Sequence, residues 1–115
     1  YIDWWYKNGD AGRQHYAISY ENKEGHKALF YVDFVIRMKN GQIFLFDTKS
    51  AGSDVDAVEK HNALIDYMVS EENKDKHLKG GIIIERNNNW KYCPLKIENT
   101  TDIVEWDSFY PKEYK

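Results

Sequence analysis

The stretch FYVDFVIRMKNGQIFLFDTKS, residues 30–50, decides the fold that we predict for this chain. Two segments rich in β-branched and aromatic side chains, 28–38 and 42–49, flank the short sequence Lys39-Asn40-Gly41. Such segments on either side of a turn that contains Asn-Gly are typical of a β-hairpin. Charged side chains interrupt the apolar pattern at Asp33, Asp47 and Lys49. Charges in strands are costly unless they are paired or bind a metal, so these three need a reason.

The register of this hairpin decides whether the charged residues meet. A two-residue loop at Asn40-Gly41 would pair Asp33 with Thr48 and place it on the opposite face from Asp47. A three-residue loop, with Gly41 left-handed as in a G1 bulge, pairs Met38 with Gln42 and Asp33 with Asp47. This second register also sorts the side chains into two sets. One face carries Phe34, Ile36, Met38, Phe44 and Phe46, and the other carries Asp33, Val35, Leu45, Asp47 and Lys49. We therefore predict the bulged hairpin.

The rest of the chain alternates strand and helix patterns. Residues 16–21 favour a strand, and the polar stretch 22–27 favours a turn. Ser53 and Asp56 resemble a capping box, followed by apolar residues at helical spacing from Val55 to near Ser70. Gly80-Gly81 lead into IIIE, typical of a strand buried on both faces, and WKYCPLKI (90–97) is a further strand, which Pro94 places at an edge. We expect the tail from Thr100 to pack on the sheet surface. The order strand, strand, strand, helix, strand, strand predicts a mixed α/β fold.

Composition narrows the class of protein. The 115 residues fit one domain, and 42% hydrophobic with 30% charged residues is ordinary for a soluble protein. No apolar run approaches the roughly 18 residues of a membrane helix, so we expect no membrane partner. The net charge of −3 counts against a nucleic-acid binder held by bulk charge alone. A lone Cys93 favours a reducing, cytoplasmic location, and the start at Tyr1 leads us to expect a piece of a longer polypeptide.

The predicted hairpin assembles the parts of a metal-dependent hydrolytic site. Two carboxylates directly opposite on one face repel each other, and a divalent cation removes that repulsion. Oxygen-only ligands suit Mg²⁺ or Mn²⁺, which commonly bind one or two protein carboxylates plus a substrate phosphate. Strand geometry turns the Thr48 side chain away, but its backbone carbonyl lies between Asp47 and Lys49 and is a further ligand candidate. Lys49 would orient the attacking water and offset developing negative charge, which suits phosphodiester hydrolysis.

This spacing, Asp33 followed by Asp47-Thr48-Lys49, resembles the motif of the PD-(D/E)xK nuclease superfamily. WWYKNG (4–9), FYVDFVI (30–36) and FDTKSAG (46–52) are most similar to the C-terminal endonuclease domain of type III restriction enzyme Res subunits. The resemblance covers roughly residues 4–70. It implies a restriction-endonuclease-like mixed sheet flanked by helix, with Asp33 and Asp47 as metal ligands and Lys49 as the catalytic lysine. Lys60, on the predicted helix, falls where relatives often carry a residue that faces the substrate.

The resemblance also implies partners. Residues 1–115 would form a single endonuclease domain, excised from a chain with an upstream helicase or translocase motor. It would cut DNA alongside a modification (methyltransferase) subunit that reads the sequence. Two features depart from the family. Val32 replaces the usual proline before the first acid, and nothing ahead of Tyr16 has the pattern of the acid-bearing helix that many members possess.

Other interpretations are structural. The three charged residues would otherwise form a cross-strand ion pair, and a catalytically degenerate nuclease fold would serve as a DNA-binding or protein-docking module. The aromatic cluster Trp4-Trp5-Tyr6 suits core packing or docking better than base stacking. The four histidines lack zinc-site spacing, so we expect most of them to be exposed, and Cys93 to be a small strand residue. The run EENKDKHLKG is a solvated connection whose lysines (Lys74, Lys76, Lys79) are candidates for phosphate contact. A sugar-binding domain is disfavoured by the predicted helix.

Overall fold

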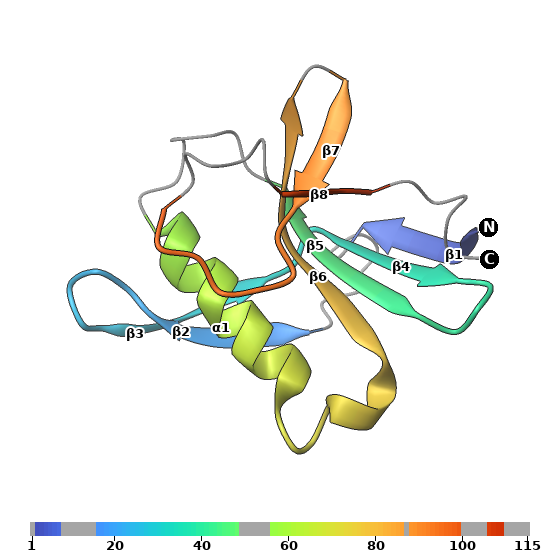
Figure 1. The fold of residues 1–115 in the computed structure, drawn as a ribbon. Helices are drawn as coiled ribbons and strands as arrows, with labels where there is room; N and C mark the ends of the chain where they lie inside the picture. Colours follow the sequence, from blue (N-terminus) through green and yellow to red (C-terminus); the bar gives the residue numbers. More distant parts are fainter. Residues whose placement is uncertain (1, 8–15, 49–55, 87, 100–105, 110–115) are drawn as a thin grey trace.

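The computed structural model describes residues 2–7, 16–48, 56–86, 88–99 and 106–109 (Figure 1). Within these ranges the chain forms eight strands, one α-helix and one 3₁₀ helix. They are β1 (Ile2–Lys7), β2 (Ala17–Glu21), β3 (Lys27–Tyr31), β4 (Phe34–Met38), β5 (Ile43–Thr48), α1 (Ala57–Val69), η2 (Lys74–Lys76), β6 (Leu78–Arg86), β7 (Asn89–Tyr92) and β8 (Asp107–Ser108). The predicted mixed α/β class is confirmed.

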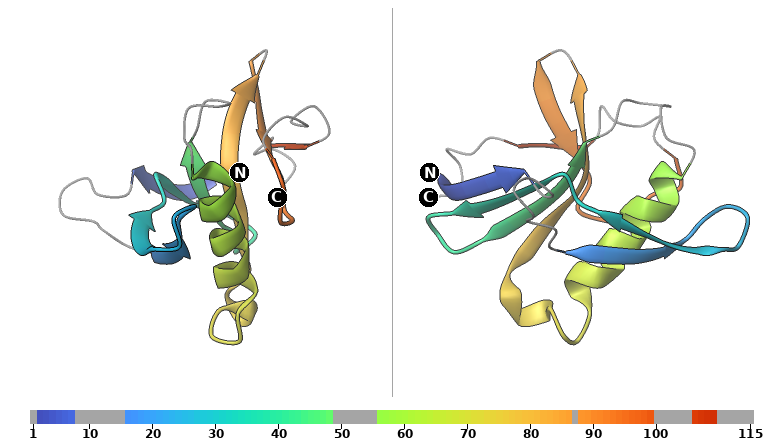
Figure 2. Two further views of the ribbon diagram at one scale, coloured as in Figure 1. Left: turned by 90° about the vertical axis from the view of Figure 1, so that its left-hand side faces the viewer. Right: turned by 180° about the vertical axis from the view of Figure 1, so that it is seen from behind.

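Two sheets are present in the described residues. The larger has six strands in the order β1-β4-β5-β6-β7-β8, and β2 and β3 form a separate two-stranded hairpin. Only the β5–β6 pair of the larger sheet is parallel, with α1 lying between these strands along the chain. The α1 helix and the β2–β3 hairpin lie together on one face of the larger sheet (Figures 1 and 2). At 13 residues α1 is too short to cross a bilayer, and no other helix in the described ranges is long and apolar enough.

The hairpin of β4 and β5 has the predicted register. Phe34 pairs with Phe46 and Ile36 with Phe44. The Met38 amide donates to the Gln42 carbonyl at 2.8 Å, which closes the three-residue loop. Gly41 has φ +94°, a conformation that residues with a side chain rarely adopt, so glycine permits this bulged turn.

The predicted sorting of side chains between the two faces is also confirmed. Val35 and Leu45 are fully buried with residues of α1 and of the β2–β3 hairpin, in the cluster Ile18, Phe30, Val32, Leu64, Ile65 and Met68. Phe44 and Phe46 pack on the other face, together with Met38, Ile83 and Tyr92. Because successive side chains of β5 point to opposite faces of the sheet, this strand contributes to both hydrophobic clusters.

Four predictions about element boundaries were wrong. Residues 28–38 form two strands, because the chain bends at Val32 and Asp33 so that β3 pairs with β2 while β4 joins the large sheet. β6 begins at Leu78, before the two glycines. β7 ends at Tyr92, so Pro94 and Cys93 lie beyond it, and β7 is not an edge because β8 pairs with it.

The ends of α1 and of the chain differ in detail from expectation. Asp56 is the N-cap of α1 but makes no side-chain cap hydrogen bond, and its Oδ1 lies 3.5 Å from the Lys23 amide nitrogen. The capping-box role predicted for Asp56 is therefore wrong, and Ser53 lies outside the described residues. In the C-terminal tail, Trp106 is buried against Ala57, Ile82 and Ile84, while Phe109 packs on the aromatic face. The described part of the tail, residues 106–109, packs on the sheet as predicted and also adds a strand to it.

Candidate functional site

Asp33 and Asp47 lie at the end of the β4–β5 hairpin that is remote from its turn. The last ladder pair is Phe34 with Phe46, and the chain bends at Asp33, so the β4–β5 ladder does not include an Asp33–Asp47 pair. Both residues lie at the same end of the hairpin, and their direct pairing on one face stays a prediction.

The Asp33 carboxylate is held by Thr48. Its Oδ2 accepts a hydrogen bond from the Thr48 amide at 2.9 Å and another from the Thr48 hydroxyl at 2.7 Å. The chain bends at Asp33, so β4 offers no backbone carbonyl to the Thr48 amide, and the carboxylate takes that place. The prediction that the Thr48 side chain turns away from the site was wrong in this respect. Its hydroxyl binds Asp33, although it lies on the Phe46 face of β5 and Asp47 lies on the Leu45 face.

Asp47 is deeply buried. Only 3% of its surface is exposed, and its Oδ2 is inaccessible to water. It lies in β5 beside Ile82 of β6, in the interior of the six-stranded sheet. Burial of a carboxylate is costly unless compensating charge or hydrogen bonds surround it, which makes Asp47 the residue of the hairpin most in need of explanation.

The donor types at this site fit a hard divalent cation. They are the carboxylates of Asp33 and Asp47 and the backbone carbonyl of Thr48, all oxygen. In the described part of the chain, no group of three or more His, Cys, Asp or Glu side chains is placed to hold a metal ion. Such a set of oxygen ligands would suit Mg²⁺ or Mn²⁺, which retain several waters, better than Zn²⁺.

Of the two lysines predicted for the site, the structure describes Lys60 and not Lys49. Lys49 lies outside the described residues. Lys60 lies on α1 with its ammonium 5.6 Å from the centre of the Tyr20 ring and 5.9 Å from that of Phe30. These are cation–π distances, so Lys60 is directed toward the β2–β3 hairpin.

His61 was missed by the sequence analysis. It is completely buried, whereas His26 and His77 are exposed as expected and His15 lies outside the described residues. Its Nδ1 accepts a hydrogen bond from the Ile82 amide at 3.1 Å, so the ring proton resides on Nε2, which donates to the Leu95 carbonyl at 2.8 Å. Burial lowers the pKa of His61 below its usual 6.5. The helical periodicity could have identified it, because His61 shares a face with Ala57, Leu64, Ile65 and Met68.

The connection after α1 is more ordered than the sequence suggested. Lys74, Lys76 and Lys79 are exposed as expected of a solvated segment. Asn73, however, is buried, and its side-chain amide donates to the Tyr67 carbonyl at 2.9 Å and to the Ser70 hydroxyl at 3.1 Å. These bonds satisfy groups at the end of α1, so Asn73 acts as a C-terminal cap rather than as a surface residue.

Comparison with known proteins gave no match, whether with family models, with curated proteins or with solved structures.

Proposed function

We propose that this chain is a Mg²⁺-dependent endodeoxyribonuclease domain that hydrolyses DNA phosphodiester bonds. Its parent would be a type III restriction or helicase-nuclease polypeptide with an upstream motor. The observation that supports the proposal is the β4–β5 register, which brings Asp33 and Asp47 to the same end of the two adjacent strands. The α1 crossover that follows β5 agrees with the resemblance to PD-(D/E)xK nucleases.

Each residue has a distinct role in this proposal. Asp33, Asp47 and the Thr48 carbonyl hold the cation, which supplies Lewis acidity when bound. The Thr48 amide and hydroxyl fix one oxygen of Asp33, and this leaves its other oxygen for the ion. Lys49 follows directly, and its ammonium would position the attacking water and offset the charge that develops on the phosphate. The net charge of −3 implies weak DNA affinity for the isolated chain, with binding supplied by the motor and the modification subunit.

The test separates metal binding from catalysis. Nicking of supercoiled plasmid in Mg²⁺ is measured for the wild type, Asp47→Asn and Lys49→Ala, and Mg²⁺ or Mn²⁺ binding is measured by calorimetry. Asp47→Asn should lose both properties, with nicking reduced by about 100-fold or more. Lys49→Ala should lose nicking and retain metal binding.

Asp75→Asn is the matched control, because it makes the same change at an exposed position and should alter neither measurement. Unchanged nicking by Asp47→Asn would refute the catalytic assignment. Thermal unfolding of each variant shows whether any loss reflects misfolding.

A second function is a catalytically degenerate nuclease fold that acts as a DNA-binding or docking module. The observation in its favour is that both hydrogen bonds of Asp33 run to Thr48, a structural role that needs no metal. Under this alternative the wild-type chain binds no Mg²⁺ at millimolar concentration, and Asp33→Asn changes stability alone.

A further inference from the structure

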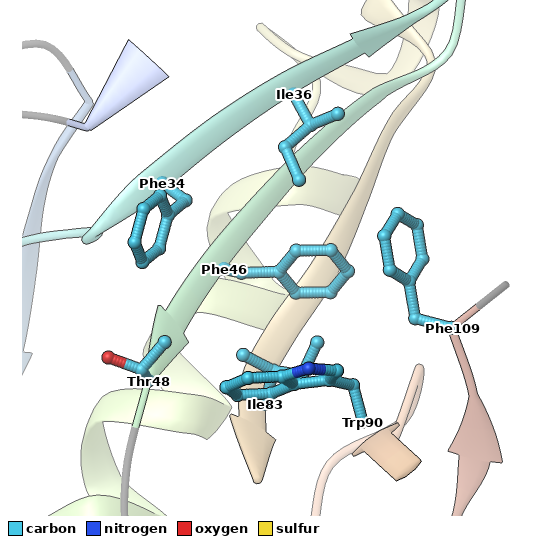
Figure 3. Close-up of a pocket in the computed structure, with 7 residues that line it drawn as sticks. All are labelled: Phe34, Ile36, Phe46, Thr48, Ile83, Trp90 and Phe109. Carbon is cyan, nitrogen blue, oxygen red and sulfur yellow. The ribbon is translucent and has the colours of Figure 1, made fainter. Parts of the chain in front are cut away.

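An open apolar cavity lies on the face of the large sheet opposite α1. Its volume is about 230 Å³, and Figure 3 shows the side chains that line it, which come from β4, β5, β6, β7 and the residue after β8. They are Phe34, Ile36, Phe46, Thr48, Ile83, Trp90 and Phe109. The volume is below the roughly 300–1,000 Å³ of pockets for drug-sized ligands, so the cavity suits a single small ring system.

The walls of the cavity favour a flat ligand. Four of its seven lining residues are aromatic, and the Phe46 and Phe109 ring centres lie 5.0 Å apart. Figure 3 shows the Trp90 indole reaching from β7 toward Ile83 and Thr48, the pair of residues that face each other across β5 and β6. Trp90 is 42% exposed, so one part of its ring system is open to an incoming ligand. Aromatic faces of this kind stack on planar rings.

The polar groups of the cavity indicate a neutral ring. Among the described residues that line the cavity none is charged, and their polar side-chain groups are the Thr48 hydroxyl and the Trp90 indole N–H. A phosphate would meet no cation among these described residues and would approach the Asp33 carboxylate that Thr48 holds. A nucleobase, with flat apolar faces and hydrogen-bonding edges, satisfies these constraints.

Thr48 connects this cavity to the candidate site. The Thr48 side chain lines the cavity, and its hydroxyl, which Figure 3 shows directed away from the other lining side chains, donates to Asp33 Oδ2 at 2.7 Å. We infer that the cavity takes one unpaired nucleobase of a DNA strand whose adjacent phosphate lies beside Asp33, at the end of β5. This inference rests on the proposed function and adds a substrate class to it, namely single-stranded or locally unpaired DNA.

The test measures binding without cleavage. Fluorescence anisotropy of a labelled twelve-residue oligothymidylate and of a blunt duplex of equal length is recorded in EDTA at low salt. The wild type should bind the single strand at least about tenfold more tightly, and Trp90→Leu should lose about tenfold, because stacking on one aromatic ring contributes on that scale. Trp90→Phe keeps a stacking surface and should recover most of the affinity.

The matched control is Tyr31→Leu, which removes an aromatic ring of nearly equal exposure, 43%, from the β2–β3 hairpin. It should change the affinity less than twofold. Equal binding by Trp90→Leu and the wild type would overturn the inference. The inference would also be overturned if the wild type bound the single strand no more tightly than the Kd of roughly 10⁻⁴ M that weak non-specific association gives.

The outcome is independent of the nuclease test. Binding in EDTA that depends on Trp90, combined with no nicking in Mg²⁺, would support the base cavity and refute the nuclease. Plasmid nicking without any dependence on Trp90 would refute the base cavity alone. Thymidine should compete with the oligonucleotide, and displacement by cyclohexanol but not by thymidine would assign the cavity to a non-nucleic-acid apolar ligand.

Discussion

The two faces of the large sheet are filled to different degrees. On the α1 face, Val35, Leu45 and Leu64 are fully buried. On the opposite face, rings pack on Phe44 and Phe46 but leave a cavity of about 230 Å³. Both faces are built from the same strands, so the difference comes from what covers them. A helix and a hairpin close one face, while in the described part of the tail Phe109 covers the other face only in part.

Polar contacts strengthen the closed face. The Asn62 side chain donates to the Ile97 carbonyl at 2.9 Å and accepts from the Ile97 amide at 2.8 Å. His61 links Ile82 of β6 to Leu95, and its ring stacks on Trp106 with centres 6.1 Å apart. The segment after β7 is thereby fixed to α1 by hydrogen bonds between α1 side chains and the backbone of that segment. A rigid face of this kind can hold the strand ends in place while the opposite face remains open for a ligand.

The largest expected loss of stability follows from the close contact between β5 and β6. Gly80 pairs with Leu45 and has φ +128°, and a Cβ there would overlap the Leu45 carbonyl oxygen. Because the obstacle is backbone in the middle of a sheet, Gly80→Ala should reduce the free energy of unfolding by more than about 4 kcal/mol. Urea unfolding measures this loss.

Gly41→Ala is the control for that prediction. Gly41 also has a positive φ, +94°, but no atom lies within 4 Å of its hypothetical Cβ. Its substitution should therefore cost only the backbone strain, about 1 kcal/mol. If the two variants lost equal free energy of unfolding, the close approach of β5 and β6 at Gly80 would not be what makes that position intolerant of a side chain.

The second effect is smaller and depends on pH. His61→Leu leaves the Ile82 amide and the Leu95 carbonyl without the ring and should cost about 2–4 kcal/mol at pH 7.5. Since burial lowers the pKa of His61 in the folded state, the unfolded chain binds more protons below the ordinary pKa of 6.5. The stability that neutral His61 contributes is therefore complete above about pH 6.5 and declines as the pH falls below it.

Urea unfolding at several pH values between 7.5 and 5 tests this expectation. The wild type should lose stability over that window, and His61→Leu should lose less of it. His26→Leu changes an exposed histidine and should keep the wild-type slope. If His61→Leu also keeps the full slope, other groups carry the acid sensitivity and the closed face has no proton-linked contact.

The same two faces show what the sequence could reveal. The Asn-Gly turn and the alternation along residues 34–46 were sufficient to predict the β4–β5 register and the sorting of Leu45 from Phe46, because both are local properties. Local patterns did not predict the break at Val32, since FYVDFVI has continuous β-propensity and only pairing with β2 separates β3 from β4. The two-residue strand β8 likewise exists through its partner β7.

The candidate site follows the same rule. The register that brings Asp33 and Asp47 to the same end of the hairpin was predictable from loop length. The Thr48 hydroxyl bond was not, because strand parity assumes that β4 continues through Asp33, whereas the chain bends there. The burial of His61 could have been predicted from helical periodicity, but its partners could not, because they come from β6 and the segment after β7, which are distant in sequence.

The smallest expected effect concerns the open face. Trp90 lies on the rim of the cavity, and Trp90→Leu should lower the free energy of unfolding by less than about 1 kcal/mol, because much of the ring is already in water. Leu64→Ala on the closed face should cost about 2–5 kcal/mol. Urea midpoints of the two variants quantify the difference between the faces. If Trp90→Leu instead costs more than about 2 kcal/mol, the cavity belongs to the core and a loss of DNA binding by that variant would report unfolding. A small cost would assign any loss of binding to the missing aromatic ring.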